Sequence, residues 1–90
     1  MDIQSISGNS NEINDLKRLY LEAFPEEERL DFKLLLEKQE AGKGNFLGFF
    51  NDGGLVGMMY YSEYKGIIYI FYFAINPKYQ SKGYGKTILE

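Results

Sequence analysis

The chain has 90 residues, of which 44% are hydrophobic, 17% aromatic and 26% charged, and its formal net charge is -3. This length allows one domain at most, and the composition is that of a folded chain rather than a disordered one. The chain has no cysteine and no histidine. Disulfides, thiolate nucleophiles and the commonest metal ligands are therefore excluded, so acid–base chemistry would depend on carboxylates, tyrosines or lysines.

The charge is distributed unevenly along the chain. Residues 1–64 carry 12 acids and 6 bases, whereas residues 65–90 carry 4 lysines and one glutamate. An acidic chain with a basic end argues against nucleic-acid binding and suits a phosphorylated small molecule, although scattered solvated lysines are the alternative. The N-terminus lacks the features of a signal peptide, and no window approaches the ~20 apolar residues of a membrane span. We therefore expect a cytoplasmic protein without membrane contact.

The first half of the chain predicts one strand and two helices. Residues 2–7 have the pattern of a short strand. Apolar side chains at helical spacing predict a helix over residues 11–24, and Asn9 with Glu12 resembles a capping box at its start. Pro25 should end this helix and open a second one over residues 26–41, whose first turn would contain three glutamates that favour the helix dipole.

The second half predicts strands joined by tight turns. Residues 45–50 and 55–64 form an expected hairpin, with Asp52-Gly53 in a turn that needs positive φ angles. A further turn at Lys65-Gly66 leads into IIYIFYFAI, residues 67–75. This run has no polar alternation, which predicts a central strand buried on both faces. Residues 85–90 then start a helix that stops after little more than a turn, so we expect the chain to end inside a structural element.

The stretch QSKGYGKT, residues 80–87, contains several features of phosphate-binding loops. A Walker A loop would need glycine where Gln80 stands, and a dinucleotide fingerprint would need glycine where Ile88 stands. The pattern Q/R-x-x-G-x-G/A fits at Gln80, Gly83 and Gly85. Glycines at a helix N-terminus let a pyrophosphate approach unpaired backbone N–H groups, while a simple strand-to-helix turn is the alternative.

This loop follows a strand that ends in FAINP, and the preceding elements have the order strand, two helices and hairpin. In these two features the chain resembles the GNAT superfamily of acyl-CoA N-acyltransferases. The resemblance covers the whole chain, and its specific part is Tyr72 to Leu89. It implies an α+β fold: an antiparallel three- to four-stranded sheet with two packed helices and a truncated third helix. Family members continue with further strands and a helix, so residues 1–90 would be an incomplete GNAT domain, its N-terminal half. Residues 67–75 would then be an apolar edge strand that can pair with a second copy.

The resemblance implies transfer of an acetyl group from acetyl-CoA, as co-substrate and without a metal, to a small-molecule or protein amine. The isolated chain would have little or no activity. In the family the strand before the loop holds the pantetheine arm, the loop holds the pyrophosphate, and a backbone N–H near Phe73 or Ala74 would polarise the thioester carbonyl. The implied acetyl-CoA-binding residues are Phe73, Ala74, Ile75, Gln80, Ser81, Lys82, Gly83, Tyr84, Gly85 and Lys86.

A general base is harder to assign, because many family members carry a carboxylate on this strand and here the strand has none. Tyr69 and Tyr72 are its titratable side chains, but tyrosine is a poor base at neutral pH and core packing is the favoured interpretation for both. Glu63 and the three glutamates 26–28 can attract a cationic amine, or the latter can simply offset the helix dipole. The catalytic candidates are Glu27, Glu63 and Tyr72, and a non-catalytic CoA-binding or protein-interaction module is the alternative to an enzyme.

Overall fold

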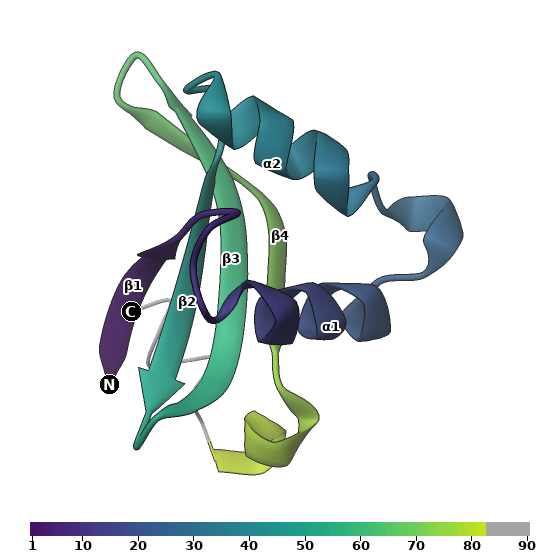
Figure 1. Cartoon of the computed structure of the whole chain (residues 1–90), viewed down its shortest axis with the longest axis vertical. Coiled ribbons are helices and arrows are strands. Elements are labelled where there is room, and N and C mark those ends of the chain that lie inside the picture. The colour runs from purple at the N-terminus through teal and green to yellow at the C-terminus, as the bar shows by residue number, and fades with distance from the viewer. Residues whose placement is uncertain (83–90) are drawn as a thin grey trace.

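In the computed structural model the backbone is described for residues 1–82 and the side chains for residues 1–79. Four antiparallel strands form one sheet in the order β1-β2-β3-β4, and both α-helices lie on the same face of this sheet (Figure 1). The α+β prediction is therefore confirmed. The elements in chain order are β1 Asp2–Ile6, α1 Ile13–Ala23, η1 Glu26–Glu28, α2 Phe32–Glu40, β2 Asn45–Asn51, β3 Gly54–Tyr64, β4 Ile67–Ile75 and η2 Pro77–Lys82.

The core lies between the helices and the covered face of the sheet. Apolar side chains at helical spacing on α1 meet alternate side chains of the strands, as the amphipathic pattern requires. Aromatic rings fill the centre: the Phe46 ring lies 5.2 Å from Phe32 and 4.6 Å from Tyr60, measured between ring centroids. The buried core cluster comprises Ile6, Leu16, Leu19, Tyr20, Phe32, Leu35, Phe46, Phe50, Met58, Tyr60 and Ala74.

The start of α1 differs from the predicted capping box. Glu12 occupies the N-cap position and makes no side-chain capping bond. Asn9 lies in a separate turn, in which the Ser10 hydroxyl accepts a hydrogen bond from the Ser7 N–H (2.9 Å). The helix itself, predicted over residues 11–24, is confirmed with bounds of Ile13–Ala23.

The second predicted helix, over residues 26–41, is wrong as a single element. Glu26–Glu28 form a short 3-10 helix, the chain is then extended at Arg29 (φ -113°, ψ 147°), and α2 begins only at Phe32. The break has a physical cause, because the Asp31 side chain accepts a hydrogen bond from the Lys33 N–H (3.2 Å) and so caps a new helix. The three glutamates are therefore not in the first turn of α2.

The turns of the second half are confirmed. Asp52 and Gly53 have φ angles of 51° and 79°, and Lys65 and Gly66 have nearly the same pair, 53° and 79°. Two consecutive left-handed residues give the tight turn that matches the twist of antiparallel strands. Each turn therefore fixes one hairpin, β2–β3 and β3–β4.

Strand β4 is present, but its predicted position at the centre of the sheet is wrong for the described chain. It is the edge strand next to β3, and its first five side chains are 47% to 58% exposed. Hydrophobicity alone predicts burial, whereas burial needs a neighbour that the described residues do not provide. The expectation of a long apolar edge strand is confirmed.

An irregularity in the β3–β4 pairing changes the direction of one side chain. Tyr60 pairs with Tyr72, but the next pair is Tyr61 with Ile70, so Phe71 is an extra residue on β4. Such a bulge bends the strand and redirects the bulged side chain.

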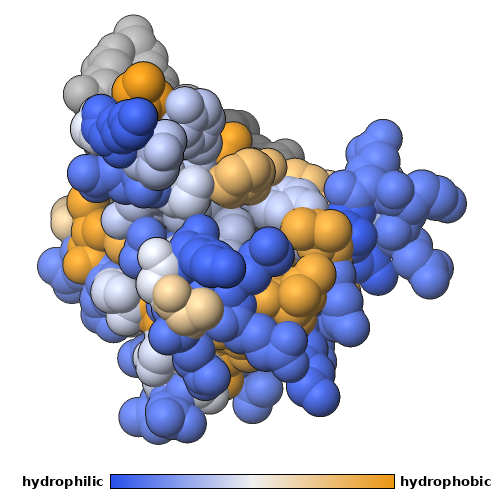
Figure 2. Space-filling view, turned by 90° about the horizontal axis from the view of Figure 1, so that it is seen from above, coloured by the Kyte–Doolittle hydropathy of each residue, from blue (hydrophilic) through white to orange (hydrophobic). Residues whose placement is uncertain are grey.

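The face seen from above in Figure 2 is mostly hydrophilic, with separate apolar patches. Within the described part of the chain, no helix is both long and apolar enough to cross a membrane.

Candidate functional site

The outer edge of β4 presents backbone groups at its C-terminal end. The Asn76 N–H donates a hydrogen bond to the Val56 carbonyl (2.7 Å), which continues the register that pairs Gly57 with Ile75. In an antiparallel ladder, both polar groups of every second residue point the same way. Counting back from Asn76, the groups of Ala74 face β3 and those of Phe73 face the outer edge. No strand among the described residues pairs with that edge.

Asn76 then turns the chain out of the sheet. Its side-chain amide donates to the Leu55 carbonyl (2.9 Å), and its side-chain oxygen accepts from the Lys78 N–H (3.2 Å). The Tyr79 N–H donates to the Asn76 carbonyl (2.8 Å) and starts η2. The predicted loop residues Gln80, Ser81 and Lys82 form the end of η2, while Gly83, Tyr84, Gly85 and Lys86 lie outside the described residues. The predicted loop therefore begins within η2, five residues after the end of β4 at Ile75.

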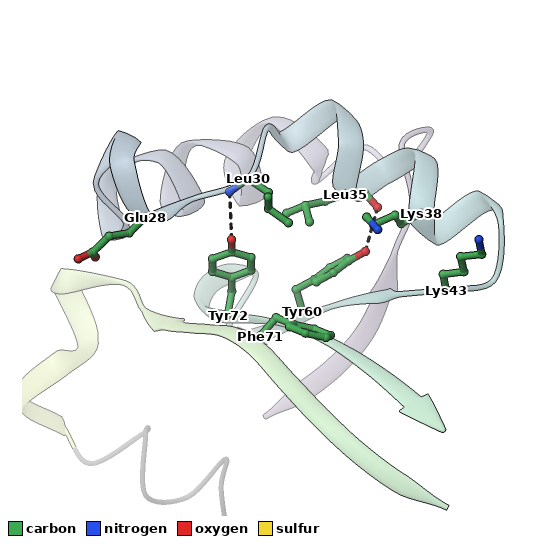
Figure 3. Close-up of a pocket in the computed structure, with 8 residues that line it drawn as sticks. All are labelled: Glu28, Leu30, Leu35, Lys38, Lys43, Tyr60, Phe71 and Tyr72. Atoms are coloured by element: carbon green, nitrogen blue, oxygen red, sulfur yellow. Dashed lines mark hydrogen bonds between the residues drawn. The ribbon is translucent and has the colours of Figure 1, made fainter. Parts of the chain in front are cut away.

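A cavity of about 260 Å³ lies on the helix side of β4, between this strand, β3 and α2 (Figure 3). Neighbouring side chains of a regular strand point to opposite faces, yet Phe71 and Tyr72 both line this cavity. The bulge at Phe71 explains this arrangement. The cavity is lined by Glu28, Leu30, Leu35, Lys38, Lys43, Tyr60, Phe71 and Tyr72.

The two tyrosines of the cavity are already bonded to backbone groups of the opposite wall. The Tyr60 hydroxyl donates to the Leu35 carbonyl (3.2 Å), and the Tyr72 hydroxyl accepts from the Leu30 N–H (3.0 Å). Both bonds are drawn in Figure 3. Burial raises the pKa of Tyr60 above its ordinary value, so this side chain is neutral at physiological pH. The ionised groups that line the cavity are Glu28, Lys38 and Lys43.

The comparisons with known proteins identify the family. The family model described as Acetyltransferase (GNAT) family matches residues 13–90. The chain belongs to this family. The fold is also that of a solved GNAT structure: a Bacteroides thetaiotaomicron protein assigned to the family as an acetyltransferase has a TM-score of 0.87 and 27% sequence identity. The match covers 99% of this chain and 52% of that protein, so the chain spans about half of its length. No curated protein matches the chain.

The three catalytic candidates of this GNAT chain lie in different parts of the structure. Tyr72 lines the cavity, with its ring 5.1 Å from Tyr20 and 5.0 Å from Phe24, measured between centroids. Glu27 is exposed in η1 and does not line the cavity, whereas its neighbour Glu28 does. Of the three glutamates 26–28, Glu28 is the one that lines the cavity.

Glu63 lies at the other end of the hairpin. It pairs with Ile68 and is exposed, and Phe73 is five residues further along β4. At ~3.4 Å per residue this separation is about 17 Å. The fold therefore does not bring Glu63 to the outer edge of β4 or to the start of the loop.

The sequence interpretation missed the side chains that complete the cavity of this GNAT chain: Lys38, Lys43, Tyr60 and Phe71. One local signal was available for the lysines. Gly42, with φ 77°, ends α2, and the Lys43 N–H donates to the Lys38 carbonyl (2.8 Å). This is the Schellman pattern, in which glycine returns the chain past the last turn of the helix. The pattern places the two lysines at the same end of α2.

Proposed function

We propose that this chain carries the donor-binding part of an N-acetyltransferase, which transfers the acetyl group of acetyl-CoA to an amine. Membership of the GNAT family supports this reaction class. The observation that carries the proposal is the continuity between the outer edge of β4, the turn at Asn76 and η2, which contains the first residues of the predicted loop, Gln80 to Lys82. An extended pantetheine arm needs such an edge, and a pyrophosphate needs such a loop.

The proposed roles follow from these positions. The outward backbone groups of Phe73 pair with the thioester end of the pantetheine arm, and its N–H is the donor that polarises the thioester carbonyl. Ala74 cannot take this role because its groups face β3. Gln80, Ser81, Lys82, Gly83, Tyr84, Gly85 and Lys86 surround the pyrophosphate. The ammonium group of the acceptor first gives one proton to water. The neutral nitrogen then attacks the thioester carbon, the C–N bond forms, the C–S bond breaks, and the second nitrogen proton passes to the leaving thiolate, so that CoA leaves as the thiol. Glu28 attracts the protonated form of the acceptor to the cavity.

Donor binding can be tested on the 90-residue chain itself. Acetyl-CoA is titrated into isotope-labelled protein and the backbone amide shifts are followed by NMR. We expect shifts at Phe73 and at Gly83 to Lys86, and binding at least about tenfold weaker in Gly83→Val, whose side chain would fill the cradle. Gly8→Ala is the control, because the added Cβ would make only an ordinary contact with Leu36 (3.8 Å). Saturating acetyl-CoA without shifts in the loop would refute the proposal.

A non-catalytic CoA-binding or interaction module is the second candidate. It is favoured by the lack of a carboxylate on β4 and by the distance of about 17 Å along the strand between the Glu63 pair and Phe73. Acetyl transfer to a mixed panel of amines separates the two candidates. Product formation supports the enzyme, whereas donor binding without transfer to any amine supports the module.

We also propose that β4 pairs with the β4 strand of a second copy. The support is a row of five exposed apolar side chains on an edge strand, which is a ready template for pairing: Ile67, Ile68, Tyr69, Ile70 and Phe71. A lysine on such an edge opposes pairing, so Ile70→Lys should shift sedimentation toward the monomer. Leu21→Lys on α1, where Leu21 is 40% exposed, should not. A chain that stays monomeric at high concentration would contradict the pairing.

A further inference from the structure

The acidic side chain and the two basic side chains that line the cavity lie at opposite ends of it. In Figure 3, Glu28 lies at one end of the row of lining residues with its carboxylate directed away from Tyr72, and Lys43 lies at the other end. Lys38 and Lys43 are joined at the end of α2 by the Lys43 N–H to Lys38 carbonyl bond. Neither lysine forms an ion pair within the described part of the chain. The cavity therefore has a negative end and a positive end.

The middle of the cavity is apolar and small. The rings of Tyr60, Phe71 and Tyr72 face the side chains of Leu30 and Leu35 across it. Its volume of about 260 Å³ is just below the ~300 Å³ at which small-molecule sites usually begin. The tyrosine hydroxyls are bonded to the opposite wall, so the ionised groups at the two ends are the polar features left to select a ligand.

Resting on the proposed acetyl transfer, we infer that the acceptor is a small amine that carries an anionic group at its far end. The ammonium group docks at the Glu28 end of the cavity, where the Tyr72 ring is one residue from the outward backbone groups of Phe73. The carbon skeleton contacts the aromatic side chains. The anionic group docks at Lys38 and Lys43. This orientation brings the nitrogen to the strand that is proposed to hold the thioester and keeps the anionic group away from it.

The lysines have another possible role, because cations in the last turn of a helix also offset its dipole. The experiment must separate the two roles. Two probes of equal chain length, ε-aminocaproate and n-hexylamine, are titrated into the 90-residue chain, and the amide shifts of Tyr60, Phe71 and Tyr72 are followed. The probes differ in one carboxylate, and we expect ε-aminocaproate to bind about fivefold more tightly, the size of an exposed ion-pair effect.

Matched variants assign the effect to particular side chains. Lys38→Gln with Lys43→Gln should abolish the preference for ε-aminocaproate and leave n-hexylamine binding unchanged. Lys33→Gln is the control, because Lys33 is exposed on the same helix and does not line the cavity. Glu28→Gln should weaken both probes about equally, and Glu27→Gln, in the same turn, should weaken neither.

Three results would overturn the inference: equal binding of the two probes, a preference that survives in the double lysine variant, or no shift of the cavity amides with either probe. A dipole role alone would lower the melting temperature of the double variant without changing the preference. Titration of the same samples with acetyl-CoA separates this inference from the proposed function. Loop shifts without a probe preference refute the acceptor class alone, whereas absence of loop shifts refutes donor binding.

Discussion

The hydroxyl group of Tyr72 holds one wall of the cavity, and its removal is a direct test of that arrangement. It accepts the Leu30 N–H (3.0 Å), and the Leu30 carbonyl accepts the Tyr20 hydroxyl (2.6 Å). The Leu30 side chain is 46% exposed and contributes little anchoring of its own. These two hydrogen bonds, together with the one from the Arg29 guanidinium to the Phe24 carbonyl (2.7 Å), hold the segment between η1 and α2.

The substitution Tyr72→Phe removes one bond and keeps the ring. The ring contacts of residue 72 with Tyr20 and Phe24 remain, so the loss is that of a single hydrogen bond, about 1 kcal/mol of the free energy of unfolding. For a chain of this size the melting temperature should fall by about 4–8 °C. Binding of n-hexylamine in the cavity should weaken, because Leu30 forms part of the wall. Acetyl-CoA binding should not change, because the backbone of Phe73 is untouched.

Urea denaturation followed by circular dichroism measures the change in the free energy of unfolding caused by Tyr72→Phe. Tyr69→Phe is the matched control on the same strand, since Tyr69 is 47% exposed and its hydroxyl makes no hydrogen bond within the described chain. It should change stability by less than about 0.5 kcal/mol. A double-mutant cycle with Tyr20→Phe should show a coupling of at least about 0.5 kcal/mol, because both hydroxyls hold the same residue. A Tyr72→Phe variant as stable as the control, with additive energies, would refute the reasoning.

Two further predictions concern the tyrosines of the core. A Cβ added by Gly44→Ala would overlap the Tyr60 hydroxyl and lie 2.5 Å from the ring carbon that carries this hydroxyl. The free energy of unfolding of this variant, measured by urea denaturation, should therefore fall by about 1–3 kcal/mol, whereas that of the control Gly8→Ala should change by nearly zero. Burial raises the pKa of Tyr20 and of Tyr60 in the folded chain above the unfolded value near ~10. The unfolded chain therefore loses these protons first. The contribution of the two tyrosines to the free energy of unfolding should be fully present below about pH 9 and fall as the pH rises through ~10. Denaturation at a series of pH values from about 8 to about 11 measures this trend, and a flat stability over that range would contradict it.

The sequence predicted the parts of the fold that depend on neighbouring residues. The turns at Asp52-Gly53 and Lys65-Gly66 were correct because positive φ angles are a local property of these dipeptides. The boundary between η1 and α2 was missed because Leu30 is fixed by Tyr20 and Tyr72, which are 10 and 42 residues away. Helical periodicity cannot register such bonds. Asp31 was the available local signal, since aspartate is a favoured N-cap residue.

The donor-binding part and the cavity of the proposed site also differ in how far they depend on contacts between residues distant in sequence. The donor-binding part is nearly continuous in sequence, from Phe73 through the glycine loop, because a strand edge and a helix start must follow one another to hold one extended ligand. The cavity combines η1, α2 and two strands, and even the inward direction of Phe71 depends on a one-residue shift of the β3–β4 register. A slip in register reverses the faces of all following side chains, so a motif cannot encode such a wall. The proposed donor can therefore be inferred from a short pattern, whereas the order of charges along the proposed acceptor cavity follows only from the packed fold.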